Sequence, residues 1–80
     1  MAKRAVTLVF PQHLIKEPVI YRMAKQFDIV PNIRRAKVTE TVGEVVLLLE
    51  GDEERLEEGI AYLTSQGVSV QPVEGDIIEP

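Results

Sequence analysis

The sequence has no cysteine and one histidine, His13, and these absences exclude several classes of function. Without thiols, the chain can form neither a disulfide nor a thiolate metal site, and a Cys–His nucleophile is excluded. A lone histidine in the loop after the first predicted strand is typically solvated, with a ligand contact as the alternative. We therefore expect no metal and no cofactor, and the sequence favours a protein that is not an enzyme.

Long apolar runs are also missing. No stretch approaches the ~20 residues of a membrane-spanning helix, and the apolar residues 5–10 are too few for the core of an export signal. The five glycines are scattered, so no glycine-rich phosphate-binding loop is present. We expect a soluble cytoplasmic protein with no membrane span.

The apolar pattern predicts four strands and two helices. Pro18 suits the first turn of a helix, Gly67 suits a helix C-terminus, and Pro72 restricts the last strand to an edge. A turn at 41–43 predicts a hairpin in which Gly43 is free to take positive φ. The predicted strands are residues 3–10, 32–38, 44–50 and 68–73, and the predicted helices are 18–27 and 53–66.

The third predicted element, the strand at residues 32–38, has an irregular pattern. Ala36 and Val38 alternate with Arg35 and Lys37, whereas Ile33 is out of phase with them. Because side chains alternate strictly along a regular strand, this predicts a bulge, or a strand start, near residue 34.

The order of the elements is strand, helix, strand, strand, helix, strand. It is typical of the ferredoxin-like, split βαβ fold of the α+β class, in which two helices cover one face of a four-stranded antiparallel sheet. We expect a single domain over residues 1–75 and a C-terminal tail over residues 76–80.

The strand at residues 44–50 is apolar on both faces. Val46 and Leu48 point opposite to Val45, Leu47 and Leu49. Two short helices cover only one face of a small sheet, so another copy, another domain or a ligand must cover the second. We expect Val45, Leu47 and Leu49, or their alternates, to lie on the open face and to form a homodimer interface.

Charge is distributed unevenly along the chain. Residues 1–40 hold eight basic and three acidic residues, whereas residues 41–80 hold one basic and ten acidic residues. One interpretation is that the oppositely charged halves attract each other within the fold or across a dimer. The alternative is that the basic half forms an anion-binding site. Nucleic acid is not an expected partner, because the strand at 44–50 has no aromatic residue to stack bases and the net charge is −4.

Several short segments occur in a recognisable order along the chain. They are Phe-Asp-Ile-Val at 27–30, Asn32-Ile33 opening a strand, the hairpin glycine at 43, the apolar strand, and the closing pattern at 60–63 and 67–70. In this order the sequence resembles the NIL domain, the regulatory module at the C-terminus of the ATPase subunits of bacterial methionine ABC importers. Where the motif normally has leucine or a similar apolar residue, this chain has Arg34.

The resemblance implies a domain that pairs through its sheets and binds methionine near the interface. It implies a ligand site at Asn32, Ile33 and Arg34, in which the Asn32 amide binds the zwitterionic end of an amino acid. Arg34 is then a candidate carboxylate partner. The alternatives are that Asn32 only shapes the turn and that Arg34 points to solvent.

Two functions follow as hypotheses. The first is a non-enzymatic, homodimeric module that binds methionine or a related sulfur amino acid. The second is a protein-interaction adaptor that has lost ligand binding. Since these residues hold no ATPase domain, we expect a free-standing sensor, an adaptor, or a partner of another protein of sulfur amino-acid metabolism or transport.

Overall fold

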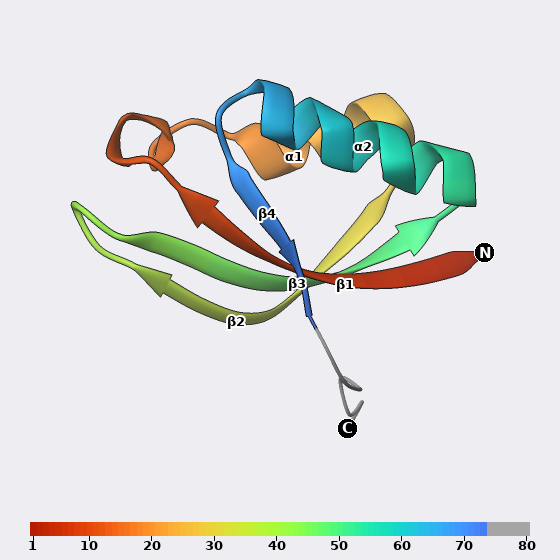
Figure 1. Cartoon of the computed structure of the whole chain (residues 1–80), viewed down its shortest axis with the longest axis horizontal. Helices are drawn as coiled ribbons and strands as arrows, with labels where there is room; N and C mark the ends of the chain where they lie inside the picture. The colour runs from red at the N-terminus through yellow and green to blue at the C-terminus, as the bar shows by residue number, and fades with distance from the viewer. Residues whose placement is uncertain (74–80) are drawn as a thin grey trace.

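Four strands form one antiparallel sheet in the order β2-β3-β1-β4, and two helices lie on one of its faces (Figure 1). This arrangement confirms the predicted ferredoxin-like α+β fold. The computed structural model describes residues 1–73, so the tail predicted over 76–80 lies outside the described residues. The elements are β1 (Ala2–Phe10), the 3-10 turn η1 (Gln12–Leu14), α1 (Val19–Phe27), β2 (Val30–Val38), β3 (Gly43–Gly51), α2 (Glu53–Ser65) and β4 (Ser69–Pro72).

The helix ends follow from residues that stop or start a helix. Pro18 is the N-cap of α1, and Asp28 ends it with a left-handed backbone at φ 54°. Glu53 and Glu54 lie in the first turn of α2, where negative charge is favourable next to the helix dipole. Gly67 follows α2 with φ 102°, which confirms its predicted role, because glycine adopts this conformation without steric cost.

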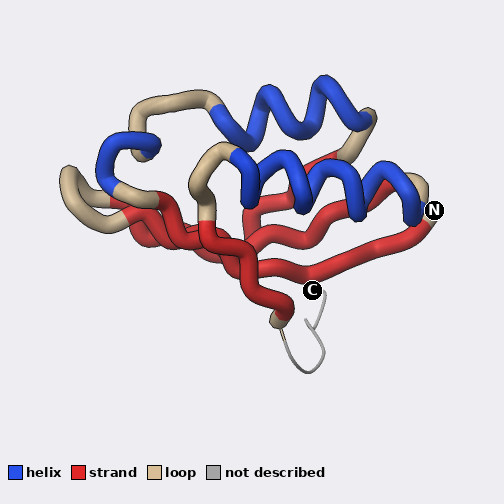
Figure 2. The backbone as a smooth tube through the Cα atoms, turned by 45° about the horizontal axis from the view of Figure 1, so that its top comes forward, coloured by secondary structure: helices blue, strands red, loops and turns tan. Residues whose placement is uncertain are grey.

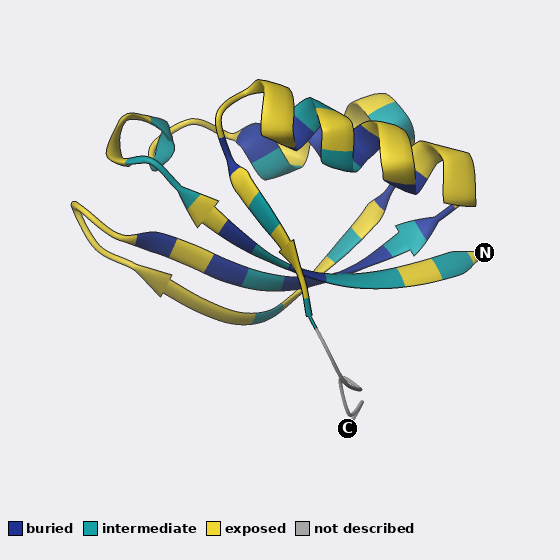
Figure 3. Cartoon of the chain, viewed as in Figure 1, coloured by how far each residue is buried: buried dark blue, intermediate teal, exposed yellow. Residues whose placement is uncertain are grey.

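The hydrophobic core lies between the sheet and the two helices (Figure 2). Figure 3 shows that the helix sides turned toward the sheet are buried and the outer sides are exposed. The helices contact each other at Gly59, where an added Cβ would lie 2.5 Å from Ile29 Cδ1 and 3.1 Å from Met23 Sδ. The buried residues of the core cluster are Val6, Leu8, Val19, Met23, Ile29, Val45, Leu47, Leu49, Leu56, Leu63 and Val68.

The structure corrects the face assigned to strand β3. Leu47 and Leu49 are 0% exposed and Val45 is 6% exposed, and all three belong to the core beneath the helices. They are therefore not on the open face, by which we mean the face of the sheet opposite the helices. Their alternates Val46 and Leu48 face that way, because side chains alternate along a strand.

Strand β2 contains the predicted bulge. Ile33 is opposite Leu47 and Arg35 is opposite Val46, so Arg34 is an extra residue between two consecutive positions of β3. Because of the bulge, the apolar side chains before and after position 34 both face the helices.

Gly43 has a different role from the one expected. It lies in β3 and does not take positive φ, and an added Cβ would lie 3.1 Å from Phe10 Cβ and 3.2 Å from Ile15 Cγ1. The glycine is therefore needed for the close approach of neighbouring side chains.

Candidate ligand-binding site

The three predicted ligand residues are consecutive on β2, but the sheet separates their side chains. Asn32 is opposite Leu48, which places it on the open face, whereas Ile33 is opposite Leu47 on the helix side. Arg34, at the bulge, lines a hollow on the open face. The structure therefore brings Asn32 and Arg34 to the same face and places Ile33 on the other.

The hollow on the helix side is apolar. It has a volume of about 280 Å³ and lies between the start of α1, the loop before it and the edge strand β2. Ile33 is 60% exposed beside it, and Tyr21 is 62% exposed, so its outer wall is incomplete in a single chain. The lining residues are Phe10, Ile15, Glu17, Pro18, Val19, Ile20, Tyr21, Ile33, Ala36, Val38, Gly43 and Val45.

The hollow on the open face is cationic. It has a volume of about 300 Å³ and is lined by Thr7, Arg34, Arg35, Val46 and Val73. The Nε and Nη2 atoms of Arg34 are buried there, so its guanidinium lies against the protein and does not extend into solvent. This corrects the alternative in which Arg34 points to solvent.

The sequence did not place Thr7 and Val73 beside Arg34. Their positions follow from the register of β1 with β3 and of β4 with β1. Alternation along each strand assigns residues to a face, but alternation alone does not fix how far one strand slides along the next.

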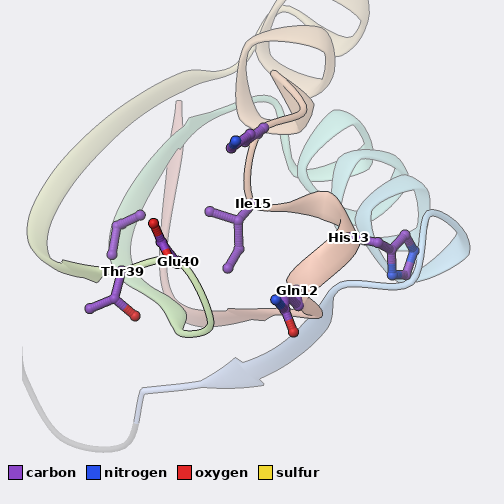
Figure 4. A pocket seen from close by; sticks show the side chains of 7 residues that line it. Gln12, His13, Ile15, Thr39 and Glu40 are labelled. Carbon is purple, nitrogen blue, oxygen red and sulfur yellow. The ribbon is translucent and has the colours of Figure 1, made fainter.

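A wider hollow of about 1090 Å³ separates the η1 turn from the β2–β3 hairpin (Figure 4). Ile15 points into it, with Thr39 and Glu40 on one side and Gln12 and His13 on the other. The His13 side chain is exposed, which agrees with a solvated loop histidine. Four of these residues are exposed, so the hollow is an open surface depression with no enclosed reaction centre.

The hydroxyl groups near the end of α2 have structural partners. Thr64 Oγ1 donates to the Ile60 carbonyl oxygen at 3.1 Å, and Ser65 Oγ donates to the Tyr62 carbonyl oxygen at 2.7 Å. Within residues 1–73 there is no group of three or more histidine, cysteine, aspartate or glutamate side chains that could hold a metal ion. In that same range no helix is long and apolar enough to cross a membrane.

The charged halves of the sequence attract each other within the fold. Arg4 Nη2 lies 3.1 Å from Glu53 Oε1, and Lys3 Nζ lies 3.9 Å from Glu50 Oε1. Among the described residues, Arg35 and Lys37 have no acidic side chain within 4.0 Å. Strand β2 therefore keeps positive charge on the open face.

The fold and the hollows beside β2 define a ferredoxin-like α+β domain whose edge strand lines a cationic hollow with Arg34 and Arg35 and an apolar hollow with Ile33, Ala36 and Val38. The family model of the NIL domain matches residues 4–72, so the chain belongs to the NIL domain family. This confirms the resemblance seen in the sequence.

Curated relatives are longer proteins that contain a matching segment. The methionine import ATP-binding protein MetN 2 of Acinetobacter baylyi is 42% identical over 59 residues, which cover 69% of this chain and 17% of that protein. The methionine import ATP-binding protein MetN 1 of Listeria innocua is 32% identical over 75 residues, covering 89% of this chain and 22% of that protein. The chain thus spans about a fifth of the length of these relatives.

A solved structure has the same fold. The C-terminal domain of an ABC transporter ATP-binding protein from Enterococcus faecalis superposes with a TM-score of 0.81 and is 21% identical in sequence. The superposition covers 91% of this chain and 86% of that one.

Proposed function

We propose that this chain is a non-enzymatic regulatory module that binds methionine or a related sulfur amino acid at the interface between two copies. Membership of the NIL domain family supports the proposal, together with relatives that are methionine import ATP-binding proteins. The same relatives support a cytoplasmic location beside a protein of methionine transport or sulfur amino-acid metabolism.

The observation that carries the proposal is the chemistry of the β2 edge. A methionine needs an apolar surface for its thioether chain and polar groups for its ammonium and carboxylate. Ile33 borders the apolar hollow. Asn32 and Arg34 are the residues directly before and after Ile33 in the sequence. A ligand at the edge of the sheet contacts both faces, and a second copy supplies the missing wall.

The same edge is the proposed dimer contact. Strand β2 is nine residues long and lies at the edge of the sheet. Val30, Ile33 and Val38 are 56%, 60% and 59% exposed. The outer edge of this strand has unpaired backbone groups, which together with exposed apolar side chains can form a contact with another chain. We therefore place the interface at β2, in place of Val45, Leu47 and Leu49.

Ligand binding is tested by a thermal-shift panel with the twenty amino acids, homocysteine and S-adenosylmethionine, followed by calorimetry. At a hundredfold excess over Kd, a ligand adds about 2.7 kcal/mol, which raises the Tm of a domain of this size by roughly 10 °C or more. We expect this shift with methionine or a related sulfur compound, and a much smaller one for Asn32→Ala.

Gln26→Ala is the matched control, because Gln26 is an exposed amide on the outer side of α1. It should leave the shift unchanged. Equal shifts for wild type and Asn32→Ala would remove Asn32 from the site and return it to a turn-shaping role.

The dimer is tested by sedimentation velocity of Ile33→Lys. A lysine at this exposed position places like charges against each other across the proposed interface, so we expect a folded monomer. Val42→Lys on the exposed hairpin is the control and should remain a dimer. A dimeric Ile33→Lys variant would place the interface elsewhere.

One observation favours the adaptor as a second candidate. Arg34 stands where the family motif normally has an apolar residue, and its guanidinium lies in the open-face hollow. An adaptor without ligand would give no thermal shift with any compound of the panel and would still sediment as a dimer.

A further inference from the structure

Two hollows beside the loop before α1 share a wall. The apolar hollow of about 280 Å³ and the wider hollow of about 1090 Å³ have two lining residues in common within residues 1–73, Ile15 and Val38. Ile15 belongs to the loop before α1, and its side chain points into the wider hollow (Figure 4). These two side chains therefore form the boundary between the apolar hollow and an open depression.

A close contact with β3 holds Ile15 in this wall. Gly43, the first residue of β3, is buried, and a Cβ added there would lie 3.2 Å from Ile15 Cγ1 and 3.7 Å from Ile15 Cδ1. The glycine thus leaves the space that the end of the Ile15 side chain occupies. Val38 is 59% exposed, so Ile15 makes the inner part of the wall and Val38 makes the outer part.

The apolar hollow has an exposed rim and a buried bottom. Tyr21 and Ile33 are more than half exposed at the rim, whereas Val45 is 6% exposed at the bottom. Among the described residues that line the hollow, Glu17 alone carries a charge, and its side chain is half exposed. A ligand with a charged end keeps that end at the rim, because burying an unpaired charge is costly. The apolar chain of such a ligand then points down toward Ile15.

We propose that Ile15 is a specificity-determining residue, which closes the bottom of the apolar hollow and limits the ligand to a short apolar chain. The inference rests on the proposed function, because it concerns the hollow assigned there to the thioether chain of methionine. A hollow of about 280 Å³ lies at the lower limit of ligand pockets, which measure about 300–1,000 Å³, and so suits a ligand as small as an amino acid. Removing the wall would join this hollow to a space of about 1090 Å³, in which a longer chain fits.

The wall discriminates between ligands by the length of their apolar chain. A chain longer than that of methionine must push Ile15 against Gly43, and Gly43 is fixed in the sheet between Phe10 and Val38. In a hydrophobic pocket, one methylene group changes the specificity by roughly 10–200-fold. We therefore expect methionine to bind more tightly than its homologues with longer S-alkyl groups.

The test measures Kd by calorimetry for methionine, ethionine, S-propylhomocysteine and S-butylhomocysteine, which differ only in methylene groups. For the wild type we expect the affinity to fall about tenfold or more from methionine to S-butylhomocysteine. Ile15→Ala should bind methionine more weakly and S-butylhomocysteine more tightly, because it removes the atoms that separate the two hollows. The ratio of the two Kd values should therefore change about tenfold or more. An unchanged ratio in folded Ile15→Ala overturns the proposal.

Leu14→Ala is the matched control. Leu14 is the half-buried residue directly before Ile15 and lines neither of the two hollows. This variant should keep the Kd ratio of the wild type. A change as large as that of Ile15→Ala would show a general loosening of the loop and would overturn the proposal. If Ile15→Ala does not fold, Ile15→Val removes only the Cδ1 methyl group and should change the ratio in the same direction.

A second probe separates this inference from the proposed function. Methionine binding with the same Kd ratio in wild type and Ile15→Ala leaves the proposed function in place and removes Ile15 from it. If none of the four amino acids binds, the proposed function fails, and straight-chain alcohols from propanol to octanol then probe the hollow through the amide NMR signals of Gly43 and Val45. We expect the wild type to exclude alcohols that Ile15→Ala still binds. The same length limit in both proteins, or no shift with any alcohol, overturns the proposal.

Discussion

The two faces of the sheet are made by the same strands and are stabilised by different forces. On the helix face, Leu47 and Leu49 are completely buried by residues of the same chain. On the open face, β3 presents Val46 and Leu48 between Glu44 and Glu50. Burial within the chain closes the first face, whereas charged residues surround a short apolar centre on the second. The comparison teaches that the first face depends on burial by residues of the same chain, whereas the second keeps its apolar centre short and bordered by charge.

The largest loss of stability is expected when a buried side chain is removed from the helix face. Leu47→Ala should lower the free energy of unfolding by about 2–5 kcal/mol, because it leaves a cavity in the core. Chemical denaturation followed by circular dichroism measures this.

Val46→Ala is the control on the opposite face of the same strand. Val46 is only partly buried, and we expect a loss of about 1 kcal/mol or less. Similar losses for the two variants would mean that both faces depend equally on burial within the chain.

A second substitution tests how closely the residues beneath the helices are packed. Gly59→Val should cost about 1–3 kcal/mol, since the new side chain enters the space held by Ile29 and Met23. Ala61→Val, at an exposed position of α2, introduces the same residue without a clash and should cost less than about 0.7 kcal/mol. Thermal or chemical unfolding of the pair separates overpacking from helix propensity.

The smallest effects concern one ion pair on each face. Arg4→Gln removes the 3.1 Å contact with Glu53 at the rim of the helix face and should cost about 0.2–1 kcal/mol. Lys3→Gln removes the 3.9 Å contact with Glu50 on the open face and should cost less. Unfolding at about 0.05 M and about 1 M salt tests both, because screening should abolish the differences from the wild type.

Much of the fold was predictable because single residues determine local structure. Gly67, Pro18 and Pro72 were correctly related to a helix end, a helix start and an edge strand. The bulge was predictable because Ile33 breaks the alternation of β2. These features depend on steric limits within a few residues, which the sequence records directly.

Other features depend on contacts between distant strands. Both sets of alternate residues in β3 are apolar, so the pattern did not determine that Leu47 faces the helices. Gly43 was assigned to a turn because its contact with Phe10 and Ile15 is not local. The arrangement of Thr7 and Val73 beside Arg34 likewise requires the registers of three strand pairs.

The bulge in β2 also has a consequence for changes in chain length. Ile33 and Arg35 are already opposite consecutive residues of β3. Deleting Arg34 would therefore leave β2 and β3 regularly paired and would move no other side chain to the opposite face of the sheet. A deletion elsewhere in the strand would carry Ala36 and Val38, or the residues before the bulge, to the opposite face. Position 34 is thus a site where this chain is expected to lose one residue and still keep the same sheet.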